Sequence, residues 1–248
     1  MKKYRGILFD LFATLALWHP DRLPQFTYKG KTVPSTLGEL KCLIEQAVTE
    51  ASFDEFYTAF TEVNEEHTDF RAKHLKEIPS RERFNSTLLR LGYPSSDATS
   101  AIAETLSLRH MELLASVAKI PPEYAPFLKR LSENYQLALV SNFDHHPTAH
   151  QILTRDGAHP HFEEILISDS HGWRKPHRRI FDDALLALSL SAEEVLFVGD
   201  SWEDDVVGAA NAGIDVAWVN AKNKPRPNEL HVPTFEINNI IELEDHLP

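Results

Sequence analysis

Near its start the chain carries Gly6-Ile7-Leu8-Phe9-Asp10-Leu11-Phe12-Ala13-Thr14-Leu15, in which a short apolar run ends in a carboxylate. A run this short and this apolar is typical of a parallel strand that is buried on both faces. A carboxylate at the mouth of such a strand is poorly solvated, so a partner must compensate its charge. Asp10 is therefore the first residue for which we expect a functional role.

Three further apolar runs are each followed by polar or charged residues that could take part in catalysis. Leu137–Val140 leads into Ser141-Asn142, Ile165–Ile167 precedes Arg174-Lys175-Pro176, and Val195–Val198 leads into Gly199-Asp200, with Asp204 and Asp205 beyond. In an open parallel sheet, ligands bind outside the carboxyl ends of the strands. We therefore expect a hydroxyl, a lysine and several carboxylates to converge on Asp10.

Strands and helices alternate in the second half of the chain. The apolar runs predict strands at Gly6–Leu11, Leu137–Val140, Ile165–Ile167, Val195–Val198 and Val216–Val219. Helical spacing predicts helices at Phe127–Asn134, Ile180–Leu188 and Asp205–Ala212, the last with Gly213 as its stop. This alternation predicts an α/β fold with a doubly wound, mainly parallel sheet.

Residues 16 to about 120 contain no comparable strand run and follow helical spacing instead. One helix is marked at its start by the capping box Ser52-Phe53-Asp54-Glu55. We expect an inserted α-helical cap domain over residues 17–120 and an α/β core domain built from residues 1–16 and 121–248. The segment His19–Ser35 fits neither period; it is a hairpin with its turn at Lys29-Gly30, or a loop.

Composition narrows the class of protein. A chain of 248 residues fits one domain, or one domain with an insertion. The net charge of −12 argues against nucleic acid or anionic lipid as the main partner, although a local lysine or metal can still attract a phosphorylated substrate. Cys42 is the only cysteine, and no apolar run approaches the ~20 residues of a membrane helix. We expect a cytoplasmic enzyme with a small-molecule substrate, of undetermined oligomeric state.

The four segments, in this order and over nearly the whole chain, resemble the haloacid dehalogenase-like (HAD) hydrolase superfamily. The resemblance implies a Rossmann-like core with a cap inserted between the first and second motifs. It implies Asp10 as the nucleophile, Ser141 and Lys175 as further catalytic residues, and Asn142, Phe12 and Thr14 as substrate-binding residues. It also implies Mg²⁺, held by Asp10, the backbone carbonyl of Phe12 and Asp200, with Asp204 or Asp205 as a ligand or an outer partner.

The residue types suit this chemistry. A carboxylate can form a covalent intermediate that water hydrolyses, by attack either on phosphorus or on a carbon bearing a halide. Carboxylates as close as Asp200, Asp204 and Asp205 repel one another unless a cation is present, and magnesium prefers oxygen ligands. Purely structural roles are the alternative. Asp10 would then be a helix cap or salt-bridge partner, and the other acids would decorate a helix N-terminus, which explains Asp200 poorly.

Phe12 departs from the phosphatases of this superfamily, which usually carry a second Asp at this position as the general acid and base. Its haloacid dehalogenases carry an aromatic residue there, but they lack an acid-rich fourth motif. We expect a magnesium-dependent, phosphatase-like hydrolase of a small phosphorylated metabolite. The alternatives are a cofactor-independent 2-haloacid dehalogenase and a catalytically weak binding protein on the same fold.

Several histidines remain to be placed. His145 and His146 follow the second motif, where we favour solvated loop positions over an acid–base role. His159-Pro160-His161 resembles part of a zinc site but lacks a further ligand nearby in the sequence.

Overall fold

The computed structural model describes residues 4–228 and 230–247. The chain divides into two compact units. The α/β unit comprises Met1–Trp18 and Lys119–Pro248, and the helical unit comprises His19–Ala118.

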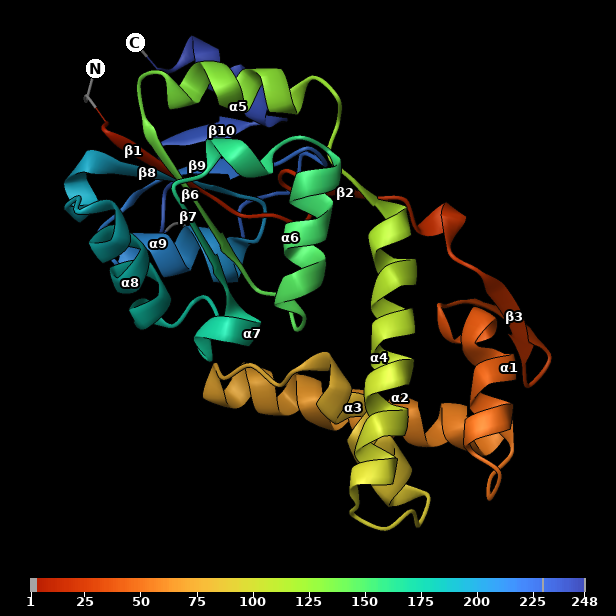
Figure 1. Ribbon diagram of the computed structural model, residues 1–248. Coiled ribbons are helices and arrows are strands. Elements are labelled where there is room, and N and C mark those ends of the chain that lie inside the picture. The colour runs from red at the N-terminus through yellow and green to blue at the C-terminus, as the bar shows by residue number, and fades with distance from the viewer. Residues whose placement is uncertain (1–3, 229, 248) are drawn as a thin grey trace. The chain divides into compact units, whose positions relative to one another are not determined.

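A six-stranded sheet forms the centre of the α/β unit, in the order β10-β9-β8-β1-β6-β7 (Figure 1). Its strands are β1 (Gly6–Phe9), β6 (Gln136–Ser141), β7 (Glu164–Ile167), β8 (Val195–Gly199), β9 (Asp215–Val219) and β10 (Phe235–Ile237). All five neighbouring pairs are parallel. The structure thus confirms the predicted doubly wound α/β fold, because strand order reverses on either side of β1.

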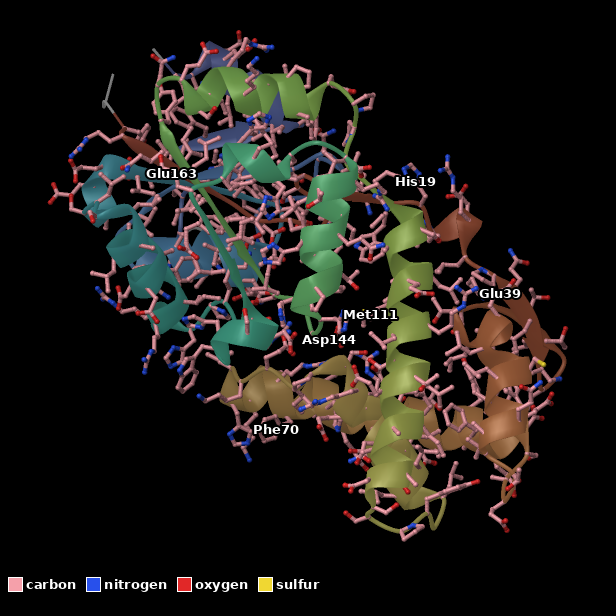
Figure 2. The ribbon with its side chains drawn as sticks, in the orientation of Figure 1. His19, Glu39, Phe70, Met111, Asp144 and Glu163 are labelled. Atoms are coloured by element: carbon pink, nitrogen blue, oxygen red, sulfur yellow. The ribbon has the colours of Figure 1, made fainter. Side chains whose placement is uncertain are left out.

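Helices cover both faces of this sheet (Figure 1). They are α5 (Tyr124–Ser132), α6 (His146–Arg155), α8 (Arg178–Leu188) and α9 (Gly208–Asn211), while the single-turn α7 (Ser168–His171) directly follows the end of β7. Leu8 and Phe197 pack on one face against Phe181 of α8, while Phe9 on the opposite face contacts Phe162. Side chains fill the space between the sheet and these helices (Figure 2). The strands β1, β6, β8 and β9 are therefore buried almost throughout, which explains their nearly continuous apolar sequences.

The sheet register brings the candidate residues to one edge. Phe9 lies opposite Leu139 of β6 and Val198 of β8. Asp10 comes directly after Phe9, and its backbone N–H donates to the carbonyl of Val198 at 2.9 Å. Ser141 and Asp200 each lie two residues beyond the residue paired with Phe9. Three neighbouring strands thus deliver a carboxylate, a hydroxyl and a second carboxylate to the same place.

Two predicted elements need correction, and one strand was missed. β1 ends at Phe9 rather than Leu11, because the chain turns at once and the Leu11 carbonyl accepts from the N–H groups of both Leu15 and Ala16. The helix expected at Asp205–Ala212 is a π-helical turn, Trp202–Val207, followed by the short α9. Strand β10 was not predicted, because its three residues include a central glutamate and give no apolar run.

The helical unit contains α1 (Leu37–Ala47), α2 (Phe53–His74), α3 (Ser80–Arg90) and α4 (Asp97–Val117). The predicted capping box begins α2, with Ser52 and Glu55 satisfying each other's backbone N–H groups. Phe56, Phe84 and Leu106 belong to its buried core. The hairpin interpretation of the preceding segment is the right one: β3 (Gln25–Tyr28) and β4 (Lys31–Pro34) pair antiparallel across Lys29-Gly30.

Two short strands, β2 (Leu17–Trp18) and β5 (Ala118–Lys119), pair with each other where the chain passes between the units. None of the helices in the described ranges combines the length and hydropathy that a membrane crossing requires.

Candidate active site

A buried lysine lies between two aspartates at the carboxyl edge of the sheet. The Nζ atom of Lys175 is 2.7 Å from Oδ1 of Asp10 and also 2.7 Å from Oδ1 of Asp205. All three residues are buried. Buried charges are tolerated only when they are paired, so these contacts hold the three side chains in a fixed arrangement.

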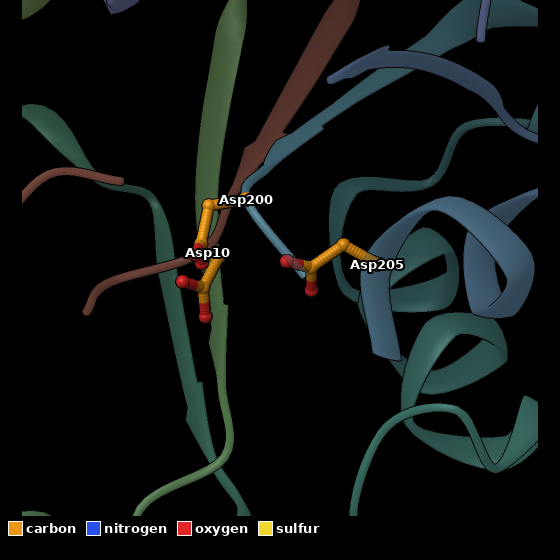
Figure 3. Close-up of side chains that lie close together, drawn as sticks. All are labelled: Asp10, Asp200 and Asp205. Carbon is orange, nitrogen blue, oxygen red and sulfur yellow. The ribbon is translucent and has the colours of Figure 1, made fainter. Parts of the chain in front are cut away.

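Asp200 completes a cluster of three carboxylates. One oxygen atom from each of Asp10, Asp200 and Asp205 lies within 4.8 Å of the other two (Figure 3). Three carboxylates facing one ammonium leave an excess of negative charge. This set of oxygen donors suits Mg²⁺, which binds through a few carboxylates and completes its octahedron with substrate and water oxygens.

The pKa values of Asp10 and Asp200 reflect this excess of negative charge. Burial raises the pKa of Asp10 to about 7, with the nearby charge of Asp205 adding to the rise and Lys175 opposing it. Burial likewise raises the pKa of Asp200 to about 6. Burial disfavours the charged form of Lys175, but Asp10 and Asp205 outweigh it and raise the pKa of the ammonium. Asp10 and Asp200 therefore keep their protons to a higher pH than ordinary carboxyl groups do, and a divalent ion would displace those protons.

Local backbone contacts orient the Asp205 carboxylate toward Lys175 and Asp10. The backbone N–H of Ser201 donates to Oδ2 of Asp205 at 2.9 Å, leaving Oδ1 for Lys175. A Cβ atom at Gly199 would overlap the Asp205 carboxylate, so only glycine leaves room for it. Gly199 therefore contributes to the site because its missing side chain leaves room for the Asp205 carboxylate.

Asp204 points elsewhere. Its Oδ2 accepts a hydrogen bond from Nδ2 of Asn142 at 3.2 Å, and it is not a member of the three-carboxylate cluster. Of the two acids that the sequence leaves open, Asp205 is the one that faces Asp10. Asn142 also brackets the backbone of Lys175: its Oδ1 accepts from the Lys175 N–H at 2.8 Å and its Nδ2 donates to the Lys175 carbonyl at 2.9 Å. The Asn142 side chain therefore positions the lysine.

Two buried hydroxyls make no hydrogen bond within residues 4–228 and 230–247. These are Oγ of Ser141 and Oγ1 of Thr14, both on residues that are 1% exposed. Buried polar atoms without a partner are uncommon and call for an explanation such as a bound ligand. Ser141 is the last residue of β6, the strand paired with β1, so its hydroxyl is suited to donate to a substrate anion near Asp10.

An aromatic cluster surrounds Phe12. The Phe12 ring stacks on Trp18, with ring centroids 4.9 Å apart, and lies against Phe143 at 4.6 Å. Phe143 was not singled out from the sequence, although it directly follows the Ser-Asn pair of the second motif. Asp144, labelled in Figure 2, comes next in the same loop and is buried.

The histidines have partners outside the carboxylate cluster. Nδ1 of His146 lies 2.9 Å from Asp169, and Nδ1 of His145 lies 2.8 Å from the Thr148 hydroxyl. Nε2 of His159 lies 3.1 Å from a ring nitrogen of His150, a neighbour that the sequence did not indicate.

Asp10 thus lies at the carboxyl end of a central parallel strand, beside the buried Lys175 and close to the carboxylates of Asp200 and Asp205. The chain belongs to the haloacid dehalogenase-like hydrolase family, whose model matches residues 4–213. The predicted membership is confirmed.

Known proteins that are similar to this chain include proteins named as phosphatases and proteins named as dehalogenases. It is 26% identical over 249 residues to the HAD-hydrolase YfnB of Bacillus subtilis (strain 168), covering 98% of this chain and 95% of that protein. It is 28% identical over 212 residues to the glyceraldehyde 3-phosphate phosphatase of Methanopyrus kandleri, covering 83% and 85%. A crystal structure of 2-haloacid dehalogenase from Pseudomonas syringae pv. Tomato DC3000 superposes with a TM-score of 0.73 at 22% identity, covering 98% and 97%. The last likeness shows the fold alone.

Proposed function

We propose that this protein is a magnesium-dependent hydrolase that acts on a small phosphorylated metabolite through a covalent intermediate on Asp10. The three-carboxylate cluster of Asp10, Asp200 and Asp205 carries this proposal. Two comparisons support it: the relative from Methanopyrus kandleri is named a phosphatase, and a crystal structure of YfnB contains magnesium.

Lys175, Asp10 and Ser141 each have a role in the proposed reaction. Lys175 holds Oδ1 of Asp10, so Oδ2 is the oxygen that attacks phosphorus. The new O–P bond forms as the bond to the leaving group breaks, and the leaving group departs with that electron pair. Water then attacks the phosphorus of the aspartyl phosphate, which releases phosphate and restores Asp10. Ser141 donates its free hydroxyl to a phosphoryl oxygen.

Asp10, Asp200, Asp205 and the backbone carbonyl of Phe12 are the groups that would hold Mg²⁺. The bound ion would offset the repulsion between Asp10 and an anionic phosphate and stabilise charge in the transition state.

Phe12 narrows the substrate class. A phenyl ring cannot protonate a leaving group or activate water, and losing such a group typically costs about 10²–10⁴-fold in rate. An acyl phosphate avoids part of this cost, because its leaving carboxylate is stable without a proton. We therefore propose leaving groups of low basicity.

The aromatic cluster favours one second candidate, hydrolysis of a small 2-haloacid. There Oδ2 of Asp10 would attack the carbon, halide would leave with the C–X electron pair, and water would hydrolyse the resulting ester. The apolar surface of Phe12, Trp18 and Phe143 suits a leaving halide, whereas the excess of carboxylates opposes this function.

A substrate panel distinguishes the two. Acyl phosphates, phosphate monoesters and chloroacids are each assayed with magnesium and with a chelator. We expect turnover of acyl phosphates that requires magnesium and is lost in Asp10→Asn. Chloroacid turnover that survives the chelator would instead establish the dehalogenase.

A further inference from the structure

A small cavity lies beside the carboxylate cluster, on the side of β9. It has a volume of about 80 Å³, and Ala13, Asp200, Val219, Asn220, Ala221, Lys222 and Lys224 line it. One water molecule takes about 30 Å³ in the liquid, so the cavity has room for a small polar group. All of its lining residues belong to the α/β unit.

Two lysines supply positive charge to this cavity. Lys222 and Lys224 are both exposed, and neither forms an ion pair within 4.0 Å in the part of the chain that the structure describes. Asp200 is the one acid in the cavity lining, and it faces the candidate metal position. The two ammonium groups are therefore available to an incoming anion.

A buried asparagine fixes the backbone of Lys224. Oδ1 of Asn220 accepts from the Lys224 N–H at 2.8 Å, and Nδ2 of Asn220 donates to the Lys224 carbonyl at 2.9 Å. The same Nδ2 donates to Glu236 on β10 at 2.7 Å. The N–H of Asn223 donates to the Asn220 carbonyl at 2.9 Å and so forms a turn. Asn223 has a φ of 49°, a left-handed conformation that asparagine tolerates.

The backbone of Lys224 is held by Asn220 in the same way as the backbone of Lys175 is held by Asn142; we call each such pair of hydrogen bonds a bracket. Asn142 and Asn220 each follow directly after a strand of the sheet, β6 and β9. Each binds the backbone N–H and carbonyl of one lysine, at 2.8 and 2.9 Å in both cases. Lys175 uses its ammonium on Asp10 and Asp205, whereas within residues 4–228 and 230–247 the Lys224 ammonium forms no ion pair, although its charge acts on Asp200. The fold thus positions two lysines in the same way at the same edge, and Lys175 is the one already held in a buried ion pair.

We propose that Lys224 is a substrate-binding residue that, with Lys222, forms a second anion subsite for a carboxylate or second phosphate group of the substrate. The preferred substrates of the enzyme would then carry a further anionic group beside the phosphoryl group that reacts at Asp10. This inference rests on the proposed function, because the phosphoryl group is the anchor at the first site. Asn220 acts through Lys224 and is a positioning residue.

The test uses matched non-hydrolysable probes in the presence of magnesium. Methylphosphonate and phosphonoacetate differ only in a carboxylate, as do ethylphosphonate and 3-phosphonopropionate, which reaches one carbon further. Calorimetry gives the dissociation constant of each probe. For at least one pair, we expect the carboxylate to tighten binding about tenfold, which equals about 1.4 kcal/mol.

The variants assign this gain to Lys224. Lys224→Met should reduce the carboxylate gain to threefold or less, Lys224→Arg should retain most of it, and the exposed Lys129→Met should keep it in full. Asn220→Ala, which keeps the charge of Lys224, should also reduce it. If Asn220→Ala does not fold, Lys224→Met and Lys224→Arg decide the matter.

The outcomes separate the two proposals. A phosphonate that binds with no gain from the carboxylate, or a gain that Lys224→Met leaves intact, overturns the subsite and leaves the proposed function standing. Failure of all four probes to bind the wild-type protein overturns the phosphoryl anchor, and the subsite with it.

Discussion

The Nζ atom of Lys175 lies 2.7 Å from Oδ1 of Asp10, and both side chains are buried. The lysine holds one carboxylate oxygen and leaves the other available. It also neutralises part of a cluster that would otherwise repel itself. The same contact therefore serves both stability and the proposed chemistry.

Lys175→Met tests this dual role. Removing one partner of a buried ion pair leaves an uncompensated charge and typically costs about 3–5 kcal/mol, so we expect a loss of this order in the free energy of unfolding near neutral pH. The loss should shrink at lower pH, because Asp10 then becomes protonated. Urea unfolding at two pH values measures it, with Lys129→Met as the control for an exposed lysine. An equal loss at both pH values would contradict the electrostatic explanation.

Magnesium binding should depend on pH in a defined direction. The pKa values of Asp10 and Asp200 rise from 3.8 to about 7 and about 6, so the native state holds these protons more tightly than the unfolded chain. Their contribution to stability is full below pH 3.8 and is lost as pH rises through about 6 to 7. Magnesium must displace these protons, so its affinity rises over the same range.

We expect millimolar magnesium to raise the melting temperature more at about pH 8 than at about pH 5.5. Asp200→Asn should remove most of this response, whereas Asp69→Asn, on the exposed surface of α2, should keep it. A response that is the same at both pH values would argue against binding by these carboxylates.

Gly199→Ala should disable the site without touching a charged residue. The added Cβ would overlap the Asp205 carboxylate, so the acid must move away from Lys175 and Asp10. We expect a smaller magnesium response and a loss of activity comparable to that of Asp205→Asn. Thermal melts and the acyl phosphate assay measure both. Normal activity in a folded Gly199→Ala protein would show that the position of Asp205 is not critical.

Phe12→Asp tests whether a general acid at position 12 increases the hydrolysis of phosphate monoesters. An Asp at this position could protonate an alkoxide leaving group, so turnover of phosphate monoesters should rise relative to that of acyl phosphates. The variant also breaks the contacts with Trp18 and Phe143, each worth about 0.5–1.5 kcal/mol, and we expect a lower melting temperature. Phe12→Leu controls for the lost aromatic contacts. If Phe12→Asp folds and binds magnesium but leaves the ratio unchanged, the missing acid does not limit this enzyme.

The sequence predicts the parts of the site that follow directly from strands. Asp10, Ser141 and Asp200 each come after a buried apolar run, and parallel strands end at a common edge. The choice between Asp204 and Asp205 depends on side-chain direction within one π-helical turn, which residue spacing does not determine.

Other features depend on contacts between distant or irregular segments. The aromatic cluster joins Phe12 and Phe143, which are brought together only by the pairing of β1 with β6. The Asn220–Lys224 bracket lies in a loop, where no period in the sequence marks it. Its likeness to the Asn142–Lys175 bracket is visible only in the structure.

The proposed reaction places a phosphoryl group on Asp10, and acid quenching can trap this intermediate. The protein is mixed with magnesium and an acyl phosphate, quenched in acid during the first turnover, and digested for mass spectrometry. We expect the peptide containing Asp10 to gain the mass of one phosphoryl group, and the same peptide of Asp10→Asn not to gain it. Turnover of the acyl phosphate with no phosphoryl group on Asp10 at any quench time, or with the group on another residue, would show that Asp10 is not the nucleophile.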